Sequence, residues 1–342
     1  MKITSRMLNS AYSHYQNLAK EGKWKKSLSY AKNAFEIRKQ IHGEESKHTA
    51  ALAQNYGSNL YKLGKNKQAE KLLNIALSIK EKNQGKESPD LIPVLTSLGK
   101  AAANNKSSRS QEKYFRRMLS IAEDKFGKMS SQYASLQIKV GTSLYDTGHM
   151  SKAKKHFFSG YEKLRTELGD SSLETGIAAF HVGKYEMTNR DYKSAIKYLN
   201  QALISFDSGS ATSRNELIAH AFLINAYENI GESEKATQHC LAIGRMEPMT
   251  DLQNYVPIFK KSPKYPRAAL KSGSSGDVTV EFTVDENGFV VQPKMVSFNG
   301  HRAFIKSALK AAEAFRYAPA FVDDKVVATS GVQNRIIYEI RP

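Results

Sequence analysis

Apolar positions in residues 1–246 recur with helical spacing, and the helical segments follow one another in pairs. Examples are His48–Leu63 with Lys67–Asn83, and Ser131–Thr147 with Ser151–Leu168. The pattern has a period of 42 residues, which three independent residue classes share. The classes are Gly57, Gly99, Gly141 and Gly183; Gly43, Gly85, Gly127 and Gly169; and Ser27, Ala69, Gln111, Ala153, Ala195 and Ala236, whose last step is 41.

Each glycine class has a distinct physical meaning. The Gly57 class lies inside apolar-periodic segments, where glycine costs about 1 kcal/mol relative to alanine unless a neighbouring helix must approach closely. The Gly43 class closes the second helix of each pair, where positive φ is needed. A further set, in the turn between partner helices, comprises Gly22, Gly64, Gly148 and Gly231. The sequence therefore predicts an all-α solenoid of about six helix pairs over residues 1–246.

The pattern changes after residue 246. Three of the nine prolines fall between Tyr255 and Pro266, and residues 247–262 are predicted to be a linker before a domain at 263–342. Residues 278–284 then alternate between apolar and polar side chains, as a half-buried strand does. Asn287-Gly288 predicts a hairpin turn. The elements expected next are a second strand from Phe289 to about Val296, an amphipathic helix from His301 to Tyr317, and a last strand from about Gly331 to Ile340.

The order of these strands can also be predicted. The first two strands form a hairpin, and the helix returns the chain so that the last strand pairs with the first. The expected order is second, first, last, which makes a three-stranded antiparallel sheet with helices. The second strand would be an edge that tolerates Pro293. The last strand would be the other, open edge.

The 342 residues carry a formal net charge of +18, unevenly distributed. Residues 1–200 hold 35 Lys and Arg against 18 Asp and Glu, or +17. Such a field favours acidic partners, namely an acidic peptide, an anionic lipid surface or nucleic acid. A solvated helix surface that keeps the solenoid soluble is the alternative. No recognition helix or RNA-binding motif accompanies the charge, so nucleic acid is not expected as a partner.

First helices of such repeats line a groove, and five residues are predicted to bind a partner there. Tyr61, Lys100, Lys139, Tyr145 and Lys184 lie at or near the periodic glycines. Lysines interleaved with tyrosines suit an extended or helical peptide of acidic character. The alternative is that several of these residues pack between repeats. We refer to them below as the groove residues.

No catalytic or metal-binding constellation is present in the sequence. Phosphate-binding loops, the G-x-S-x-G elbow and H-E-x-x-H are absent, so the chain is expected to be non-enzymatic, without cofactor or metal. Cys240, at an apolar helix position, is predicted to be a buried, inert thiol. His149 and His156 lack a carboxylate or cysteine nearby and are expected to be solvated or partly packed.

The sequence lacks the patterns of a membrane span and of a secretory signal. No stretch approaches the roughly 20 apolar residues of a membrane span, so membrane contact is expected to be peripheral. Residues 1–20 lack the apolar region of a secretory signal, which fits either a cytosolic protein or one whose signal or anchor precedes the numbering.

The helical region resembles the tetratricopeptide repeat, from about Ser5 to Met246. The longer 42-residue period is similar to that of kinesin light chains. The third unit departs from the motif, with Lys106 and Gln111 in place of the usual Gly and Ala. The residues that carry the resemblance are Leu63, Gly64, Ala69, Leu73 and Ala76; Gly148, Ala153 and Phe157; and Tyr192, Ala195, Leu199 and Ala202.

Residues from about Pro263 to Ile340 resemble the TonB C-terminal domain. Departures from the family pattern are Phe315 for a common tryptophan, Asp324 for a common glycine, and the interruption at Phe298-Asn299. The carrying residues are Tyr265, Pro266, Ala268, Gly276, Val278–Val284, Asp285, Gly288, Ser297, Gly300, Ala308, Phe315, Arg316, Tyr317, Pro319 and Ala320.

This resemblance implies a function in the periplasm of Gram-negative bacteria. The family's domain adds an extended segment of an outer-membrane transporter to its exposed last strand, with backbone hydrogen bonds providing affinity. The residues implied to contact such a segment are Gln333, Arg335 and Ile337 of the last strand, and Tyr265 with the region before it. The chain would be an adaptor or an energy-transducer-like component. The alternative is a cell-envelope assembly scaffold whose terminal domain mediates oligomerisation, and the sequence leaves the oligomeric state open.

Overall fold

The computed structural model describes residues 5–207, 214–246 and 255–340. The chain divides into two compact units, one ending at Gly169 and one beginning at Asp170, and each is described by itself. Among the described residues, no helix combines the length and apolar character that a membrane span requires.

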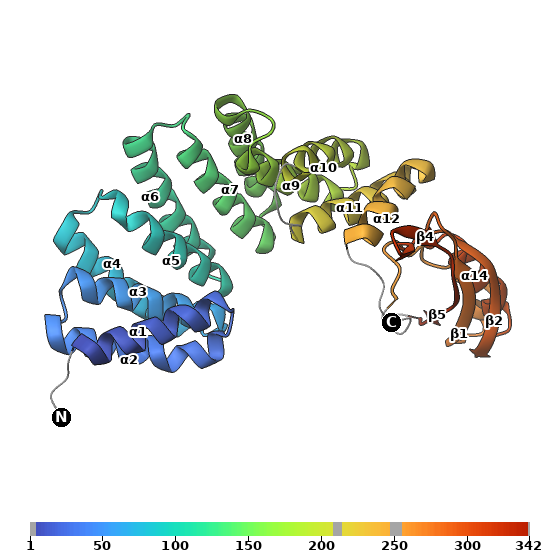
Figure 1. The fold of residues 1–342 in the computed structure, drawn as a ribbon, viewed down its shortest axis with the longest axis horizontal. Helices are drawn as coiled ribbons and strands as arrows, with labels where there is room; N and C mark the ends of the chain where they lie inside the picture. The colour runs from blue at the N-terminus through green and yellow to red at the C-terminus, as the bar shows by residue number, and fades with distance from the viewer. Residues whose placement is uncertain (1–4, 208–213, 247–254, 341–342) are drawn as a thin grey trace. The chain divides into compact units, whose positions relative to one another are not determined.

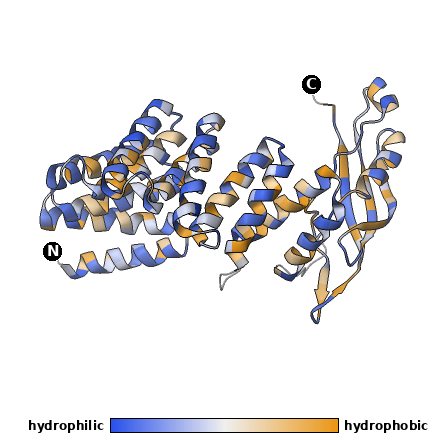
Figure 2. Ribbon diagram, turned by 90° about the horizontal axis from the view of Figure 1, so that it is seen from above, coloured by the Kyte–Doolittle hydropathy of each residue, from blue (hydrophilic) through white to orange (hydrophobic). Residues whose placement is uncertain are grey.

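The first unit consists of paired helices that stack side by side (Figure 1). Hydrophobic and hydrophilic residues are interleaved along each helix, as expected for amphipathic elements (Figure 2). The predicted helices at 48–63, 67–83, 131–147 and 151–168 all form, with ends within about two residues. The elements are α1 (Ser5–Lys20), α2 (Trp24–His42), α3 (Lys47–Lys62), α4 (Asn66–Gln84), the 3₁₀ helix η1 (Pro89–Leu91), α5 (Ile92–Asn104), α6 (Ser108–Phe126), α7 (Ser131–Asp146) and α8 (Met150–Leu168).

The periodic glycines allow the two helices of a pair to touch, as predicted. A Cβ atom built on Gly99 would lie 2.3 Å from the ring of Phe115, and one built on Gly57 would lie 2.8 Å from Leu73. Gly141 and Gly183 face Phe157 and Leu199 in the same way. The small-residue class is buried throughout; its members are Ser27, Ala69, Gln111, Ala153, Ala195 and Ala236.

Replacing Gly99 by alanine is expected to destabilise the first unit by about 1–3 kcal/mol, because the added methyl group overpacks against Phe115. Adding Phe115→Leu should recover part of this loss, since leucine is what faces Gly57. The measurement is urea unfolding followed by the fluorescence of Trp24, the single tryptophan, which lies in α2. Additive effects of the two changes would contradict the contact, because touching residues couple by about 0.5–3 kcal/mol.

Repeated caps set the ends of the helices. Gly43, Gly85, Gly127 and Gly169 all have φ between 81° and 89°, which confirms their predicted role as C-caps. Serines with the same 42-residue spacing precede the first helices. The hydroxyl oxygens of Ser46 and Ser130 accept hydrogen bonds from the backbone N–H three residues later, a standard N-cap. The caps therefore share the period of the core.

The third repeat keeps the geometry despite its altered sequence. Lys106 stands where Gly64 and Gly148 stand in other repeats, and it adopts the same positive φ, at 58°. Gln111 is buried, and its amide nitrogen donates to the hydroxyl oxygen of Ser143 at 3.1 Å. A hydrogen bond to the next repeat thus compensates for the missing alanine.

The second unit contains four further helices and an α+β domain. The fold class is therefore an all-α region of paired helices followed by a small α+β domain, as predicted. The elements are α9 (Leu173–Thr188), α10 (Tyr192–Asp207), α11 (Arg214–Ile230), α12 (Ser233–Met246), α13 (Arg267–Lys271), β1 (Gly276–Val284), β2 (Val290–Asn299), α14 (Ala303–Ala312), β3 (Ala320–Val322), β4 (Lys325–Val327) and β5 (Thr329–Tyr338).

The main sheet has the order β2-β1-β5, with both pairings antiparallel, which confirms the predicted topology. The alternate residues of β1 that were predicted to face inward are buried. They pack against Phe304 and Ala308 of α14 and against the inward residues of β5. The core therefore lies between the sheet and α14.

Three local predictions were incomplete. The helix predicted from His301 to Tyr317 ends at Ala312, because the backbone of Arg316 and Tyr317 bonds to Phe259 and Gly288 instead of continuing the helix. The short helix α13 and the β3–β4 hairpin were not predicted. Asp323 and Asp324 form the exposed turn of that hairpin, both with positive φ.

Part of the predicted linker, residues 247–254, lies outside the described residues. The remainder contacts the C-terminal domain: Tyr255 is buried in its core, and Phe259 forms an isolated bridge with Arg316. The boundaries 1–246, 247–262 and 263–342 stay a prediction. A cut that tests them should fall before Tyr255.

Candidate protein-binding site

The outer edge of β5 is a regular, open strand edge. Residues Val332 to Tyr338 pair with Phe282 to Gly276 of β1 without a shift in register. Among the described residues, no backbone hydrogen bond reaches β5 from its other side. Seven consecutive residues thus present an uninterrupted row of backbone groups to an incoming strand.

The opposite edge, β2, is irregular. Its pairing with β1 shifts register twice, Gln292 has a φ of 52°, and Pro293 lacks an amide donor. Bulges and prolines are the features by which natural sheets block strand addition. Of the two edges, β5 is therefore the one suited to pair with a second chain.

The predicted contact residues of β5 lie on the exposed face of the sheet. Arg335 donates two hydrogen bonds to the carboxylate of Asp277, at 3.0 and 2.9 Å, and this contact lowers the pKa of Asp277. The amide of Gln333 donates to Glu281 at 2.8 Å. Ile337 is exposed. Arg335 and Gln333 are thus held by neighbours in β1, whereas Ile337 offers an apolar contact.

Tyr265 lies against the core. Its ring makes edge-on contacts with Phe304 and Tyr338, at centroid distances of 5.5 and 5.7 Å, and its hydroxyl donates to the carbonyl of Ser274. Tyr265 is half-buried, so part of its ring remains accessible beside the end of β5.

Three of the groove residues come together in the first unit. Burial raises the pKa of Tyr61, and Asp146 contributes to the rise. Burial lowers the pKa of Lys100, and the neighbouring cations Lys62 and Lys139 lower it further, while Asp146 opposes them. The predicted lysine–tyrosine cluster therefore exists, but it includes a carboxylate that sequence reasoning did not assign.

The other two groove residues are placed separately. Tyr145 is half-buried and packs on Phe157 at a centroid distance of 6.2 Å. Lys184 belongs to the second unit, where it lies near His181. The pKa of His181 falls to about 4, first through burial and then through Lys184.

Arg316 is a buried residue whose role sequence reasoning missed. Its side chain is 1% exposed and joins the C-terminal domain to α11 and α12. Nη1 pairs with Glu228 at 2.7 Å and donates to the carbonyl of Ser233 at 3.1 Å. Nη2 donates to the hydroxyl of Thr237 at 2.8 Å.

The same guanidinium also binds its own domain. Nη2 donates to the carbonyl of Asn287 at 3.0 Å, and the group stacks on the ring of Phe289 at 3.7 Å. Cys240 lies beside it and is buried, as predicted, and burial raises its pKa to about 11. Its thiol is therefore protonated at neutral pH. We call Arg316 and Glu228 with these partners the Arg316 contact.

A metal site is not found among the described residues, since no group of three or more histidine, cysteine or carboxylate side chains gathers there. The described residues instead provide strand edges, charged surfaces and a buried contact between the helices and the C-terminal domain.

Comparison with known proteins identifies the two parts. The family described as Gram-negative bacterial TonB protein C-terminal matches residues 261–340, and a tetratricopeptide-repeat family matches residues 16–82. The chain thus combines tetratricopeptide repeats with a TonB C-terminal domain, two modules that serve protein interaction.

Individual proteins are similar to parts of the chain. Protein TonB of Vibrio cholerae is 35% identical over 66 residues, which are 19% of this chain and 27% of that protein. The chain thus matches about a quarter of the length of this curated relative. The structure of BtubC (BKLC) from P. vanneervenii matches 71% of this chain and 97% of that chain, with 16% identity and a TM-score of 0.56, which supports the repeat fold alone. A putative kinesin light chain from Podosopora anserina covers 58% of this chain and 92% of its own, at 16% identity and a TM-score of 0.46.

Proposed function

We propose that this chain is a non-enzymatic, periplasmic adaptor or energy-transducer-like protein of the TonB family. The C-terminal domain captures an extended segment of an outer-membrane transporter by adding it to β5. The repeats bind a second protein partner. The observation that carries the proposal is the unbroken register of Val332–Tyr338 at an open edge, together with the match of residues 261–340 to the TonB domain.

Strand addition fits the chemistry of this edge. Backbone hydrogen bonds provide the affinity in this mode, and side-chain contacts add selectivity. The exposed side chain of Ile337 can contact an apolar residue of the incoming strand, while Arg335 and Gln333 keep their partners in β1. Fluorescence anisotropy with a labelled extended peptide from the periplasmic end of such a transporter tests the proposal, and no binding by the full chain would reject it.

The second candidate function is a cell-envelope scaffold in which the C-terminal domain joins copies of the chain. The exposed apolar side chains of β2, namely Met295, Val296 and Phe298, favour it. Light scattering over a concentration series separates the two functions. A dimer that is lost in Phe298→Ser, together with absence of peptide binding, would support the scaffold.

The groove residues are proposed to bind an acidic peptide. The double variant Lys100→Gln with Lys139→Gln should weaken binding of such a peptide about two- to thirtyfold, since each cation–carboxylate contact near the surface contributes about 0.2–1 kcal/mol. Raising the salt concentration should weaken binding of the parent chain as well, because exposed charges are screened.

The matched control is Lys67→Gln with Lys71→Gln, which removes two exposed lysines from α4. Isothermal titration calorimetry provides the comparison. Equal losses in both double variants would mean that the peptide responds to net charge and that the groove has no special role.

A further inference from the structure

The outer side of α6 carries a concentration of cations that its counterparts in other repeats lack. Arg109, Lys113, Arg116 and Arg117 follow one another at the spacing of one helix face. At the four equivalent positions, 42 residues earlier or later, α4 carries two cations and α8 carries one. Those residues are Lys67, Lys71, Asn74 and Ile75 in α4, and Ser151, Lys155, Phe158 and Ser159 in α8.

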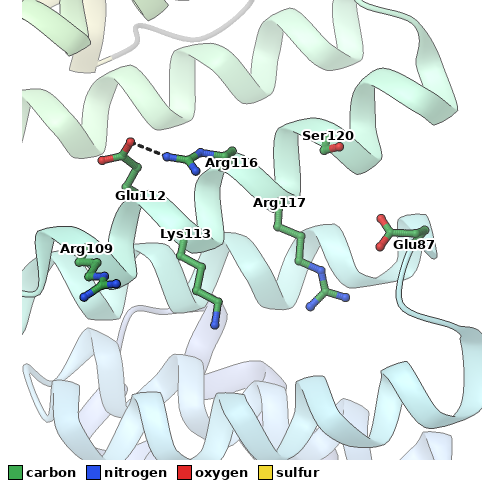
Figure 3. Close-up of a pocket in the computed structure, with 7 residues that line it drawn as sticks. All are labelled: Glu87, Arg109, Glu112, Lys113, Arg116, Arg117 and Ser120. Atoms are coloured by element: carbon green, nitrogen blue, oxygen red, sulfur yellow. Dashed lines mark hydrogen bonds and ion pairs between the residues drawn. The ribbon is translucent and has the colours of Figure 1, made fainter.

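These cations line a hollow of about 590 Å³, together with Glu87, Glu112 and Ser120. Figure 3 shows Lys113 and Arg117 extending to the same side of α6, while Arg116 turns to Glu112. Glu87 lies on the loop before η1. The surface is thus a recess with four cations and two carboxylates.

Two of the four cations are already paired with carboxylates of the chain. Arg116 binds Glu112 at 2.8 Å, and Arg117 binds Glu81 and the carbonyl of Lys86. These pairs use one or two of the five donors that each guanidinium carries. Arg109 and Lys113 are exposed, and neither forms an ion pair within the described residues. Among the described residues, Glu87 in the recess forms no ion pair either, so the recess retains free arginine donors and two unpaired cations beside one unpaired carboxylate.

We propose that this α6 recess, lined by Arg109, Lys113, Arg116 and Arg117, binds an acidic segment of a partner protein. Arginine donors in a fixed fork match the carboxylates of Asp and Glu. No aromatic side chain lines the recess, so it offers no stacking platform for bases. No exposed large apolar side chain lines it either, so it lacks an anchor for a lipid surface.

The test is binding of a labelled oligo-glutamate peptide to the full chain by fluorescence anisotropy. Arg109→Gln with Lys113→Gln should weaken binding about tenfold, the loss expected for two cation–carboxylate contacts. Lys67→Gln with Lys71→Gln removes the same charge at the equivalent positions of α4 and should change affinity less than about twofold. All four residues are exposed, so the variants should fold normally.

Repeating the titration in the Lys100→Gln/Lys139→Gln background distinguishes peptide binding at the α6 recess from peptide binding at the groove residues. The loss caused by Arg109→Gln/Lys113→Gln should persist there, whether or not the groove itself binds. Equal losses in the α4 and α6 double variants would overturn the proposal, because binding would then follow net charge. Tighter binding of a single-stranded oligonucleotide or of anionic vesicles than of oligo-glutamate, with the same dependence on Arg109 and Lys113, would also overturn it.

Discussion

Arg316→Ala is expected to lower the free energy of unfolding of the second unit by about 3–5 kcal/mol, as removal of one partner from a buried ion pair does. Glu228, whose side chain is 11% exposed, would lose its ion-pair partner. The hydroxyl of Thr237 and the carbonyls of Ser233 and Asn287 would each lose a donor. A cavity would open beside Phe289.

Two control variants distinguish the loss of the buried Arg316–Glu228 ion pair from the loss of one arginine charge. Arg335→Ala removes an exposed arginine whose partner is Asp277, and it should cost no more than about 1 kcal/mol. Replacing both Arg316 and Glu228 by methionine should recover much of the loss, because apolar residues of similar volume often substitute for buried ion pairs without cost.

Urea unfolding read by two probes locates the effect. Trp24 lies in the first unit, so its fluorescence should report the same midpoint in the parent and in Arg316→Ala. Amide hydrogen exchange of α11, α12 and the sheet should accelerate in the variant. Unchanged exchange in these elements would show that the Arg316 contact does not hold the domain to the helices.

The Arg316 contact bears on the proposed function. A segment bound to β5 would act on a domain that contacts α11 and α12 through the buried polar groups around Arg316. Force or movement at the strand edge would then reach the helices directly. Variants that break the contact should leave peptide affinity at β5 within about threefold, because the contact lies away from the β5 residues that pair with β1.

Proline in β5 is expected to abolish peptide binding, by about 100-fold or more, when it replaces an amide that points away from β1. Such a change removes a donor from the new ladder, and the ring clashes with the incoming strand. Successive amides of a strand alternate in direction, so Asn334→Pro and Arg335→Pro form a matched pair, since neither replaces a fully buried side chain. One of them removes an outward amide, and the other removes an amide that bonds to β1.

The two proline variants should affect different properties, one peptide binding and the other stability. The outward variant should melt cooperatively but not bind, whereas the inward variant should lose stability. Arg335→Ala and Gln333→Ala should weaken binding only slightly, because both side chains already have partners in β1. Strong loss of binding in these alanine variants, with normal binding in both proline variants, would mean that side chains and not the strand backbone form the site.

The repeats could be predicted because their determinants are local and periodic. Gly99 and Phe115 are 16 positions apart, and the same spacing recurs at Gly57, Gly141 and Gly183. The same contact between a glycine and a large apolar residue is therefore visible several times in the sequence. The strand order followed from one hairpin and one returning helix. The third repeat is less evident in the sequence, because Lys106 and Gln111 meet the backbone and packing requirements of the repeat although neither is the small residue typical of its position.

What could not be predicted depends on contacts between distant segments. Arg316 was recognised only as part of a family motif, since nothing near it in sequence indicates that Glu228, 88 positions earlier, would face it. Tyr255 lies in a proline-rich stretch typical of a linker, yet its ring packs on Tyr317 in the core. The carboxylate of Asp146 joins Tyr61 and Lys100 only once α3, α5 and α7 are stacked.

The central claim is that β5 is the docking edge, and backbone amide NMR of the isotope-labelled chain tests it most directly. An extended transporter-derived peptide is titrated into the full chain, and the amide shifts are followed. The account predicts that the perturbed amides fall within Val332–Tyr338 and that the outward ones become protected from exchange with water. Perturbations confined to Val290–Asn299, or absent from both edges, would contradict it.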